Sequence, residues 1–408
     1  MTKPPILSIV MPTHNRAQYA GPAIAGILDY PSRDFELVVS DTSSDGRLTA
    51  FLAERPELRN DPRLVLIRPE GPSNLTENHN SAVAAARGTY VCIIGDDDGV
   101  SKSLFDAVNW AAKKDVGAIS HRILANYAWP DFRSKLVGAG HASRLYLPRR
   151  LEPPKWRIAA ADLEALLDRG LQGTHETPRC YHGLIKRQKL EQVKERTGAY
   201  FHGSSPDMSG AVSLACILER YIEIDIPLTI PGASAKSNSG RSAMNTHKGA
   251  LLSESQTSSF EHSGWARGVP KFFSVETVWA HAGLTSLIAL APDQLQKFNF
   301  VHFLALCRAR HPEFDAEIES ATWEAADLLS QALLTFQSAV DHEKRKVRRD
   351  RYVYLAKRLL RPTAAGGRRY EGGLDDIFAA QRRLNIEMEK MSGSFEDYMR
   401  NFDLARTP

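Results

Sequence analysis

Short apolar runs alternate with longer amphipathic segments along the first 115 residues of the chain. Each run has the length and β-branched composition of a buried strand, and each segment between them has helical periodicity. We expect strands at 6–11, 35–41, 64–67 and 90–94, and helices at 17–28, 47–54, 74–87 and 102–114. Strands and helices that alternate at this spacing predict βαβ units and a mostly parallel sheet.

The pattern becomes irregular after residue 115 and changes again near residue 270. Residues 231–268 are rich in Ser, Gly, Asn and His, and a segment of this length and composition indicates a functional loop or lid. Beyond residue 269 nearly every segment has helical periodicity. We therefore expect an α/β domain at 1–235, a flexible loop or lid at 236–270, and a mainly α-helical C-terminal domain at 271–408.

Three of the predicted strands are followed by polar side chains. These are Pro12, Thr13, Asn15 and Arg16 after the first, Asp41 at the end of the second, and Asp96, Asp97 and Asp98 after the fourth. Ligands bind beyond the carboxyl ends of the strands in such sheets, so we expect these residues to converge. Three adjacent carboxylates raise one another's pKa unless a cation lies among them. A hard divalent cation that shares a substrate's phosphates would relieve the repulsion, and a solvated acidic turn is the alternative.

Composition and the absence of common motifs argue against several classes of protein. The net charge is only +4, which does not favour a nucleic-acid-binding protein. There is no GxGxxG after the first strand and no GxxxxGK[ST], so dinucleotide-binding and P-loop interpretations are weak. The four cysteines are far apart and form no CxxC pair, which predicts a reducing, cytosolic compartment and no structural zinc. No apolar run approaches the ~18–20 residues that span a bilayer, so we expect a soluble protein.

Residues 344–369 form a strongly basic segment, with 11 Lys and Arg against one acid, Asp350. Tyr352, Leu355 and other apolar residues are interleaved with these charges. Two interpretations are open: a solvated helix face with a few apolar residues packed inward, or an interfacial helix attracted to anionic lipid headgroups. No nucleic-acid recognition motif accompanies the charge, and we expect no nucleic-acid partner.

The first half of the chain resembles the family 2 glycosyltransferases, inverting enzymes of the GT-A fold that use a nucleotide-activated sugar. The resemblance is carried by LSIVMPTHNR at 7–16, FELVVSD at 35–41 and GTYVCIIGDDD at 88–98, which match in order and spacing as a set. It covers 6–115 well and 180–240 loosely, about the N-terminal 230 residues in all. One departure is DTSSD at 41–45, where the family more usually has a double-acid DDxSxD. The resemblance implies an α/β fold of GT-A type for this part of the chain and does not extend to the helical remainder.

The resemblance also implies a donor site. Pro12, Thr13 and Asp41 would hold the base and ribose, and a UDP-sugar is favoured because a carboxylate can accept the N3–H of uracil. Asn15, Arg16, Asn78 and Asn80 are expected to line the site, Arg16 as a phosphate contact. Asp96 and Asp98, with Asp97 between them, would be the DxD motif that holds Mg²⁺ or Mn²⁺ and the donor, with the register open by one residue. His247, in the predicted lid, would complete the metal shell.

Inverting transfer further requires a general base for the acceptor hydroxyl. The position of Asp207, at the start of a helix, matches the base of similar enzymes, although an Asp there can also simply complement the helix dipole. Asp131 is the second candidate, and His182 and His202 are weaker ones. Arg241 and Lys248, in or beside the predicted lid, are cations that could face the diphosphate or remain solvated.

The sequence thus predicts a metal-dependent inverting glycosyltransferase of polysaccharide biosynthesis that acts on a hydroxyl of a glycan or lipid-linked acceptor. We expect it in the cytoplasm, with peripheral contact at the inner membrane face through 344–369 as one option. A nucleotidyltransferase is an alternative, but residues 12–16 lack the Gly- and Lys-rich loop that grips a triphosphate. A non-catalytic sugar-nucleotide or glycan-binding protein on the same fold is another, although all the expected carboxylates are present.

Overall fold

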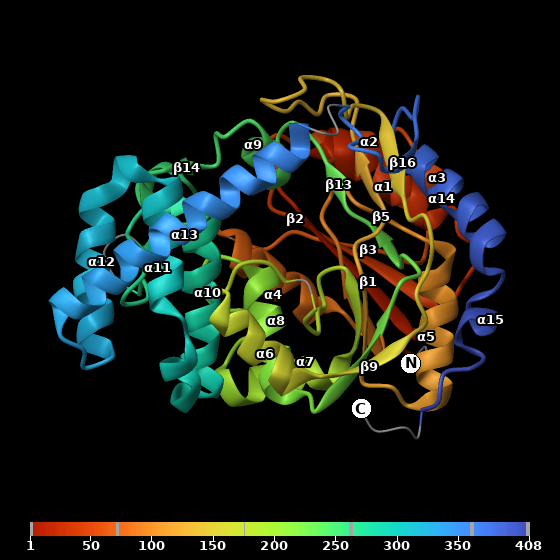
Figure 1. The fold of residues 1–408 in the computed structure, drawn as a ribbon. Helices are drawn as coiled ribbons and strands as arrows, with labels where there is room; N and C mark the ends of the chain where they lie inside the picture. Colours follow the sequence, from red (N-terminus) through yellow and green to blue (C-terminus); the bar gives the residue numbers. More distant parts are fainter. Residues whose placement is uncertain (1–2, 71–72, 175, 261–263, 360–362, 405–408) are drawn as a thin grey trace.

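An eight-stranded sheet forms the centre of the N-terminal part of the molecule (Figure 1). The computed structural model describes residues 3–70, 73–174, 176–260, 264–359 and 363–404. The strands lie in the order β3 (Leu64–Ile67), β2 (Phe35–Asp41), β1 (Leu7–Thr13), β4 (Tyr90–Ile93), β10 (Gly183–Lys186), β6 (Ala118–His121), β11 (Arg220–Ile224) and β9 (Lys155–Ile158). All run parallel except β10 and β9, which are antiparallel to their neighbours.

The central strands are buried on both faces, as their continuous apolar runs predict. On one face, Ile9 of β1 packs in a core with α1 (Ala17–Leu28), α2 (Arg47–Ala53) and α5 (Lys102–Lys114). On the other face, Val10 packs in a core with α4 (Leu75–Ala85), α7 (Arg187–Thr197) and α8 (Pro206–Ile217). Because side chains alternate along a strand, one apolar run supplies both cores.

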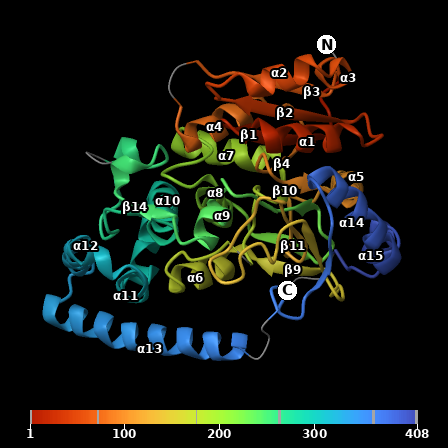
Figure 2. The same cartoon turned by 90° about the horizontal axis from the view of Figure 1, so that it is seen from above.

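A second unit of helices follows the α/β part. It comprises α10 (Val275–Leu290), α11 (Phe300–Arg310), α12 (Asp315–Leu328) and the long α13 (Leu333–Leu359). Their core includes Phe272, Phe303 and Phe336, and it reaches Met208 and Leu166 on α8 and α6 (Ala159–Asp168). Figure 2 shows α13 as a long rod along the edge of this unit. The two parts therefore share a continuous apolar contact.

Short elements connect these parts. A four-stranded sheet contains β13 (Gly232–Ala233), β7 (Asn126–Ala128), β8 (Arg144–Leu147) and β16 (Arg369–Glu371) in that order. The pairs β5 (Gly99–Val100) with β12 (Thr229–Ile230), and β14 (Lys248–Gly249) with β15 (Phe273–Ser274), are antiparallel. The remaining short helices are α3 (Pro56–Arg59), α9 (Asn238–Ala243), and the 3₁₀ turns at Leu251–Ser253, Ser258–Phe260, Pro292–Lys297 and Pro312–Phe314.

The last described segment returns to the α/β part. β16 pairs with β8, and α14 (Ile377–Ser392) and α15 (Phe395–Met399) lie beside α1 and α5, on the opposite side of the molecule from α11–α13 (Figure 1, Figure 2). Ile377 and Leu384 are fully buried in the same core as Ile9. The predicted domain boundaries at residues 235 and 270 stay a prediction. Residues 369–404, which belong to the predicted C-terminal domain, pack on the core of the α/β part and not on the helical unit.

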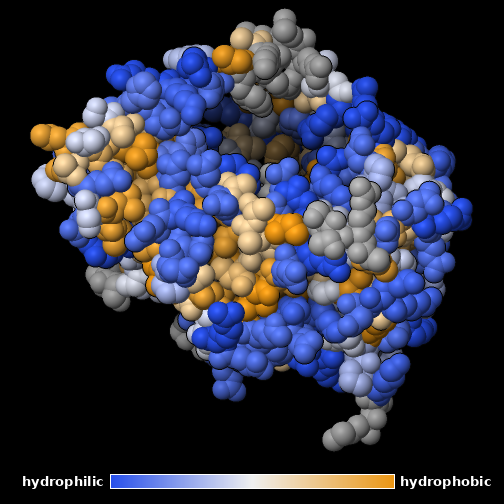
Figure 3. Space-filling view, turned by 60° about the horizontal axis from the view of Figure 1, so that its bottom comes forward, coloured by the Kyte–Doolittle hydropathy of each residue, from blue (hydrophilic) through white to orange (hydrophobic). Residues whose placement is uncertain are grey.

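The expected fold class, an α/β part with a mostly parallel sheet followed by a mainly helical region, is confirmed. The helical segment beyond residue 314 divides into α12 and α13, because Ser330 takes a left-handed φ of 52° between them. No helix in the described part of the chain combines the length and apolarity that would carry it across a membrane. The face drawn in Figure 3 is mostly hydrophilic, with apolar side chains in separate patches and a hollow near its upper edge.

Candidate functional site

The order of strands reverses between β1 and β4, because the chain fills β2 and β3 on one side before it returns to β4 on the other. In open α/β sheets a crevice forms at such a switch point, outside the carboxyl ends of the strands. Here the two strand ends are joined directly, since Thr13 Oγ1 donates a hydrogen bond of 2.7 Å to Asp96 Oδ2. A cavity of about 380 Å³ opens at this place.

The cavity combines the loops after β1 and β4 with residues from the predicted lid. Its lining includes Pro12, Thr13, Arg16, Asn78, His79, Asp96, Asp97, Asp98, Tyr181, His182, Lys236, Asn238 and Ser239. The sequence-based expectation that the first and fourth strand ends converge is therefore met by the geometry. The polar character of the lining suits a charged, hydrogen-bonding ligand.

Arg16 lies between two of the three aspartates. Its Nε donates to Asp96 Oδ1 at 2.7 Å, and its Nη2 lies 2.9 Å from Asp97 Oδ2. Burial would lower the pKa of Arg16, but the two carboxylates hold it above its ordinary value. Burial also raises the pKa of Asp96, although Arg16 opposes this. One guanidinium thus compensates two buried carboxylates.

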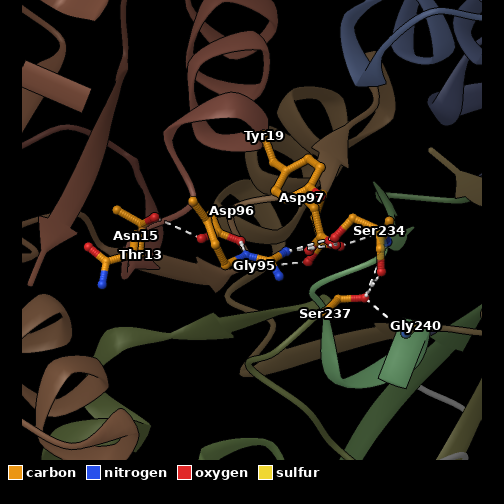
Figure 4. A network of polar contacts seen from close by, with 12 residues as sticks. Thr13, Asn15, Tyr19, Gly95, Asp96, Asp97, Ser234, Ser237 and Gly240 are labelled. Carbon is orange, nitrogen blue, oxygen red and sulfur yellow. Dashed lines mark hydrogen bonds and ion pairs between the residues drawn. The ribbon is translucent and has the colours of Figure 1, made fainter. Parts of the chain in front are cut away.

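Residues 232–240, which include the start of the predicted lid, pack directly on Asp97. Ser234 Oγ donates to Asp97 Oδ2 at 2.6 Å, and the backbone carbonyl of Asp97 accepts from Trp129 Nε1 at 2.9 Å. Ser237 Oγ in turn donates to the Ser234 carbonyl and accepts from the Gly240 N–H, which continues the network away from the sheet (Figure 4). A Cβ on Gly232 would lie 1.8 Å from the Asp97 carbonyl oxygen, so only glycine fits at this contact.

Asp98 has a different environment from its two neighbours. Its Oδ1 accepts from the Gly232 N–H at 2.6 Å and its Oδ2 from the Gly95 N–H at 2.5 Å. His182 Nε2 lies 3.3 Å from Oδ2, and in the described part of the chain no Lys or Arg forms an ion pair with this carboxylate. Burial, and next the charge of Asp97, raise the pKa of Asp98 to about 8. Asp98 is the carboxylate of the three that lacks a cation.

Asn78 is brought to the cavity as expected. It is buried on α4, and its Nδ2 lies 3.3 Å from the carbonyl oxygens of Thr13 and Ser40. Its Oδ1 has no hydrogen-bond partner among the described residues. A buried amide oxygen without a partner is an unsatisfied acceptor, and a donor group of a bound ligand would satisfy it.

Three other predicted residues make structural contacts instead and do not line this cavity. Asp41 is buried and pairs with Arg68 Nη2 at 2.9 Å. The Asn15 N–H donates to Ser43 Oγ at 2.7 Å, which ties the loops after β1 and β2 together. Asn80 accepts from the N–H groups of residues 200 and 201 through its Oδ1. These contacts neither require nor test the donor-binding roles predicted for Asp41, Asn15 and Asn80.

A second cavity of about 440 Å³ adjoins the first. The two share Leu75, His79, Tyr181, Asn238 and Ser239 in their linings, and the second adds Ser205, Pro206, Asp207, Ser242, His247, Gln256 and Trp279. Asp207 stands in the first turn of α8, where its carboxylate accepts a hydrogen bond from Ser205 Oγ. Burial raises the pKa of Asp207 against that hydrogen bond, so this carboxylate binds a proton more readily than a solvated one.

His247 lies in this second cavity and away from the three aspartates. Its Nδ1 is 3.0 Å from Ser242 Oγ and its ring packs edge-on against Phe273. Within the ranges that the structure describes, no three His, Cys, Asp or Glu side chains are placed to hold a metal ion together. The expected trio of Asp96, Asp98 and His247 is therefore not assembled, because Ser242 and Phe273 hold the imidazole in the other cavity.

The remaining predicted acid–base and cationic residues lie outside the two cavity linings, except for His182. Asp131 accepts from the Tyr19 hydroxyl and from the Ala235 N–H at 3.2 Å, outside both cavity linings. His202 Nε2 lies 2.8 Å from Thr197 Oγ1, also outside them. Arg241 pairs with Glu254, and Lys248 with Glu313, each at 2.5 Å. Of the predicted acid–base residues, Asp207 and His182 line the two cavities.

Sequence reasoning missed Tyr181, Lys236 and Trp279 as cavity residues. Tyr181 precedes β10, a strand that carries no periodic signal, and Trp279 lies on a helix beyond the expected domain boundary. Lys236 was inside the predicted lid but stands apart from the motifs that mark the strand ends. The one signal for Lys236 was its position as a basic residue in a Ser- and Gly-rich segment that follows a predicted strand.

Comparison with protein families gives a match over residues 8–162 to glycosyl transferase family 2. The chain is 34% identical over 98 residues to the "Putative colanic acid biosynthesis glycosyl transferase WcaA" of Escherichia coli (strain K12), covering 24% of this chain and 34% of that protein. It is 28% identical over 114 residues to the "Uncharacterized glycosyltransferase EpsJ" of Bacillus subtilis (strain 168), covering 27% and 31%. The chain thus spans about a third of the length of these curated relatives.

Solved structures with a similar course of the chain include S. aureus TarS, at 14% identity and a TM-score of 0.42, over 83% of this chain and 54% of that one. Another is a mannosyltransferase, PcManGT from Pyrobaculum calidifontis, in complex with GDP-Man and Mn²⁺. It has 18% identity and a TM-score of 0.37, over 84% and 88% of the two chains.

Proposed function

We propose that this protein, which resembles the family 2 glycosyltransferases over its N-terminal part, transfers a sugar from a nucleotide-diphosphate sugar to an acceptor hydroxyl with inversion. The observation that carries the proposal is the pair of adjoining cavities. One holds three aspartates and Arg16 at the switch point of the sheet, and the other holds a buried carboxylate, Asp207. A donor and an acceptor need two such compartments side by side, and these two cavities share five lining residues.

The first cavity is the proposed donor compartment. Arg16 and Lys236 line it and supply positive charge for phosphates, and the Asn78 amide oxygen can accept from a base or ribose. We favour a UDP-sugar, since neutral hydrogen-bonding groups of Thr13, Thr42 and Asn78 suit uracil and ribose. Asp41 faces Arg68 in this structure, so its predicted contact with the base would require that pair to part.

A divalent cation, Mg²⁺ or Mn²⁺, fits the residues of the donor compartment. Three adjacent buried carboxylates have one arginine for compensation, and Arg16 is directed to Asp96 and Asp97. Asp98 is left with two backbone N–H donors, a 3.5 Å hydrogen bond from the Tyr181 hydroxyl and a raised pKa, the behaviour of an oxygen ligand that lacks its ion. We propose that Asp98 holds the ion, which would neutralise charge on the leaving diphosphate. Asp96 and Asp97 would orient Arg16.

The second cavity is the proposed acceptor compartment, with Asp207 as the general base. Its carboxylate would take the proton of the acceptor hydroxyl while that oxygen bonds to the anomeric carbon and the bond from this carbon to the diphosphate oxygen breaks. Burial makes Asp207 more basic than a solvated aspartate. Trp279, half-buried beside it, presents an aromatic surface of the kind on which sugar rings pack.

A glycan or a lipid-linked glycan is the acceptor class that we propose. For the lipid-linked case, α13 supplies a basic surface: Arg345, Arg348, Arg349 and Arg351 precede the exposed Tyr352. Residues 360–362 of the predicted membrane-contact segment, and the side chains of residues 354, 355 and 357–359, lie outside the described residues. Contact with anionic lipid would bring the molecule close to such an acceptor.

The test is a screen of sugar nucleotides for hydrolysis or transfer with and without Mn²⁺, followed by Asp207→Asn with the active donor. We expect transfer to fall by at least ~10²-fold, in the range of a lost general base, while donor binding measured by calorimetry stays unchanged. Asp131→Asn is the matched control, because Asp131 is the rival carboxylate and lies outside both cavities. Full transfer by Asp207→Asn, or a loss confined to Asp131→Asn, would reject the assignment of Asp207.

A further inference from the structure

Five residues line both cavities and therefore surround the junction between the two compartments. They are Leu75, His79, Tyr181, Asn238 and Ser239, none of which is an acid, a lysine or an arginine. In the proposed reaction, the anomeric carbon is bonded to the diphosphate in the first cavity and is attacked by a hydroxyl from the second. The transferred sugar must therefore lie at this junction, and the few polar groups found there decide which sugar fits.

His79 is packed on two sides at the junction. It lies on α4, whose first turn is closed by a capping box of Asn74 and Glu77. The centroid of its ring lies 6.3 Å from that of Tyr181, in a stacked arrangement, and 6.3 Å from that of Phe201, which it meets edge-on. The side chain is only 6% exposed. These contacts fix the directions in which the two ring nitrogens point.

One hydrogen bond decides which of these nitrogens carries the proton. His79 Nδ1 lies 2.8 Å from the backbone carbonyl oxygen of Leu75, and a carbonyl oxygen only accepts, so Nδ1 is the donor. No carboxylate in the described part of the chain forms an ion pair with this ring. Burial without a counter-charge favours a neutral imidazole, and it lowers the pKa of His79 to about 4. The other nitrogen, Nε2, therefore carries a lone pair.

This lone pair opens on the junction. His79 Nε2 has no hydrogen-bond partner among the described residues, and unlike Nε2 of His247 it is not sealed in the interior. The neighbouring Tyr181 directs its hydroxyl to Asp98 Oδ2 at 3.5 Å, and so away from His79. His79 thus presents a hydrogen-bond acceptor at the place where the sugar must pass, and a sugar hydroxyl is a matching donor.

We infer that His79 Nε2 accepts a hydrogen bond from a hydroxyl of the transferred sugar, and that His79 thereby selects a donor with a free hydroxyl at that position. The inference deepens the proposed function and rests on it. A sugar that lacks this hydroxyl would leave a nearly buried acceptor without a partner. Sites built to bind a hydroxyl reject the analogue without it far better than apolar sites reject an added one.

The test uses two substitutions that separate the two nitrogen positions. In His79→Asn the amide takes the place of Nδ1 and can still donate to the Leu75 carbonyl, but no polar atom stands at the position of Nε2. In His79→Gln the amide reaches the position of Nε2, where its oxygen can accept. Circular dichroism compares the fold of each variant with that of the parent protein.

The first measurement is calorimetry of the full chain with UDP, UDP-glucose, UDP-galactose and UDP-N-acetylglucosamine. For the UDP-sugar that binds most tightly, we expect His79→Asn to weaken binding by ~5-fold or more, the effect of one lost hydrogen bond, and His79→Gln by less. UDP carries no sugar and should bind equally to the parent protein and to His79→Asn. Unchanged affinity of His79→Asn for that UDP-sugar would overturn the inference.

The second measurement identifies the hydroxyl. The kcat/KM of the preferred donor is compared with those of its 2-, 3-, 4- and 6-deoxy forms, in the parent protein and in His79→Asn. We expect one deoxy form to lose ~5-fold or more in the parent protein but less than ~2-fold in the variant, whose partner for that hydroxyl is already gone. Equal losses in both proteins at every position would overturn the inference. So would a variant that loses turnover with every donor alike while its UDP-sugar affinity is unchanged, because His79 would then act on a proton.

The outcomes separate the inference from the proposed function. If calorimetry shows UDP-sugar binding that depends on His79 and on one hydroxyl, but no sugar is transferred to an acceptor, the contact with the sugar stands and the glycosyltransferase proposal fails. If transfer occurs and the deoxy donors lose equally in the parent protein and in His79→Asn, the proposed function stands and the inference fails.

Discussion

At the scale of single residues, the buried carboxylates near the site differ in how their charge is compensated. Asp41 pairs with Arg68, while Asp96 and Asp97 share Arg16. Asp98 has no arginine or lysine partner among the described residues. Removal of one partner from a buried ion pair costs more than the pair contributes, because it leaves an uncompensated charge. Arg16 is therefore the residue whose loss should cost most.

Arg16→Gln should lower the free energy of unfolding by roughly 3–5 kcal/mol, the cost of leaving buried carboxylates without their cation. It should also weaken donor binding, since Arg16 lines the donor compartment. Urea denaturation and calorimetry with the donor measure the two effects. Arg87→Gln is a matched control: Arg87 pairs with buried Glu36 away from both cavities. It should destabilise the fold, by less because Arg87 is largely exposed, and leave donor affinity unchanged. A stable Arg16→Gln variant with full donor affinity would contradict the assignment.

Glu276 in the helical unit gives a prediction for the dependence of stability on pH. Burial alone would raise its pKa, but hydrogen bonds and charge from His311 and Arg310 outweigh burial and lower it to about 2. Because this lies below the ordinary 4.5, the ionised carboxylate stabilises the fold above pH 4.5, and the contribution is lost as the pH falls from about 4.5 toward 2. It corresponds to roughly 3 kcal/mol.

Glu276→Gln should therefore lower the urea midpoint at pH 7, and the difference from the parent protein should shrink below pH 4.5. Equilibrium urea unfolding at a series of pH values measures this. A difference between the two proteins that stays constant down to pH 3 would show that Glu276 contributes packing rather than charge.

At the scale of elements, the close contact between α1 and α14 depends on a small residue. A Cβ on Gly26 would lie 2.2 Å from Gln381 Nε2 and 3.2 Å from the Phe378 ring. Gln381 cannot move freely, because its Oε1 accepts the buried Val100 N–H at 2.9 Å. Loss of a buried hydrogen bond of this kind leaves an unsatisfied donor that costs about 1–3 kcal/mol.

Gly26→Ala should accordingly lower the free energy of unfolding by about 1–3 kcal/mol, despite the better helix propensity of alanine. Hydrogen exchange should show faster exchange in α14 and at the Val100 amide. Gly117→Ala is the control, since a Cβ there would meet only ordinary contacts at 3.7 Å and beyond. Unchanged protection of α14 in Gly26→Ala would show that Gln381 has an alternative position.

The elements also show what local sequence signals can and cannot predict. The ends of β1, β2 and β4, with Thr13, Asp41 and the three aspartates, follow from apolar runs that stop at polar residues, which is local information. β10 has only four residues and no such signal, yet it lies antiparallel between β4 and β6 and places Tyr181 and His182 beside Asp98. Local signals therefore gave no basis for placing Tyr181 and His182 beside Asp98, because the position of β10 depends on long-range pairing.

At the scale of the whole molecule, charge is distributed unevenly. The helix α13, which carries many basic residues, lies along the outer edge of the helical unit (Figure 2), and its Tyr352 is 71% exposed. Neighbouring basic and aromatic side chains favour an interface with anionic lipid. The sequence shows that this segment is basic, but tertiary contacts decide whether its interleaved apolar side chains pack inward. Arg349, Arg351, Tyr352 and Val353 are all exposed, as an interfacial helix would require.

The full chain should therefore bind vesicles that contain anionic phospholipid, with an affinity that falls as salt increases, since each basic residue near the surface contributes about 1 kcal/mol. Cosedimentation at several salt concentrations measures this. Charge reversal at Arg345, Arg348 and Arg349 should abolish binding, whereas the same change at Arg33, Arg59 and Lys135, outside α13, should not. Equal binding to neutral vesicles would contradict an electrostatic interface.

The return of β16, α14 and α15 to the first core has a consequence for biosynthesis. Ile377, Leu384 and Phe395 complete an apolar core whose first members are Leu7 and Ile9. That core cannot close until nearly 400 residues have left the ribosome, at a rate of about 5–20 residues per second. For tens of seconds the nascent chain exposes the apolar surface of α1 and β5 that α14 later covers. Synthesis in the cell should therefore depend on chaperones that shield apolar surface, and truncation before residue 369 should yield an aggregating product.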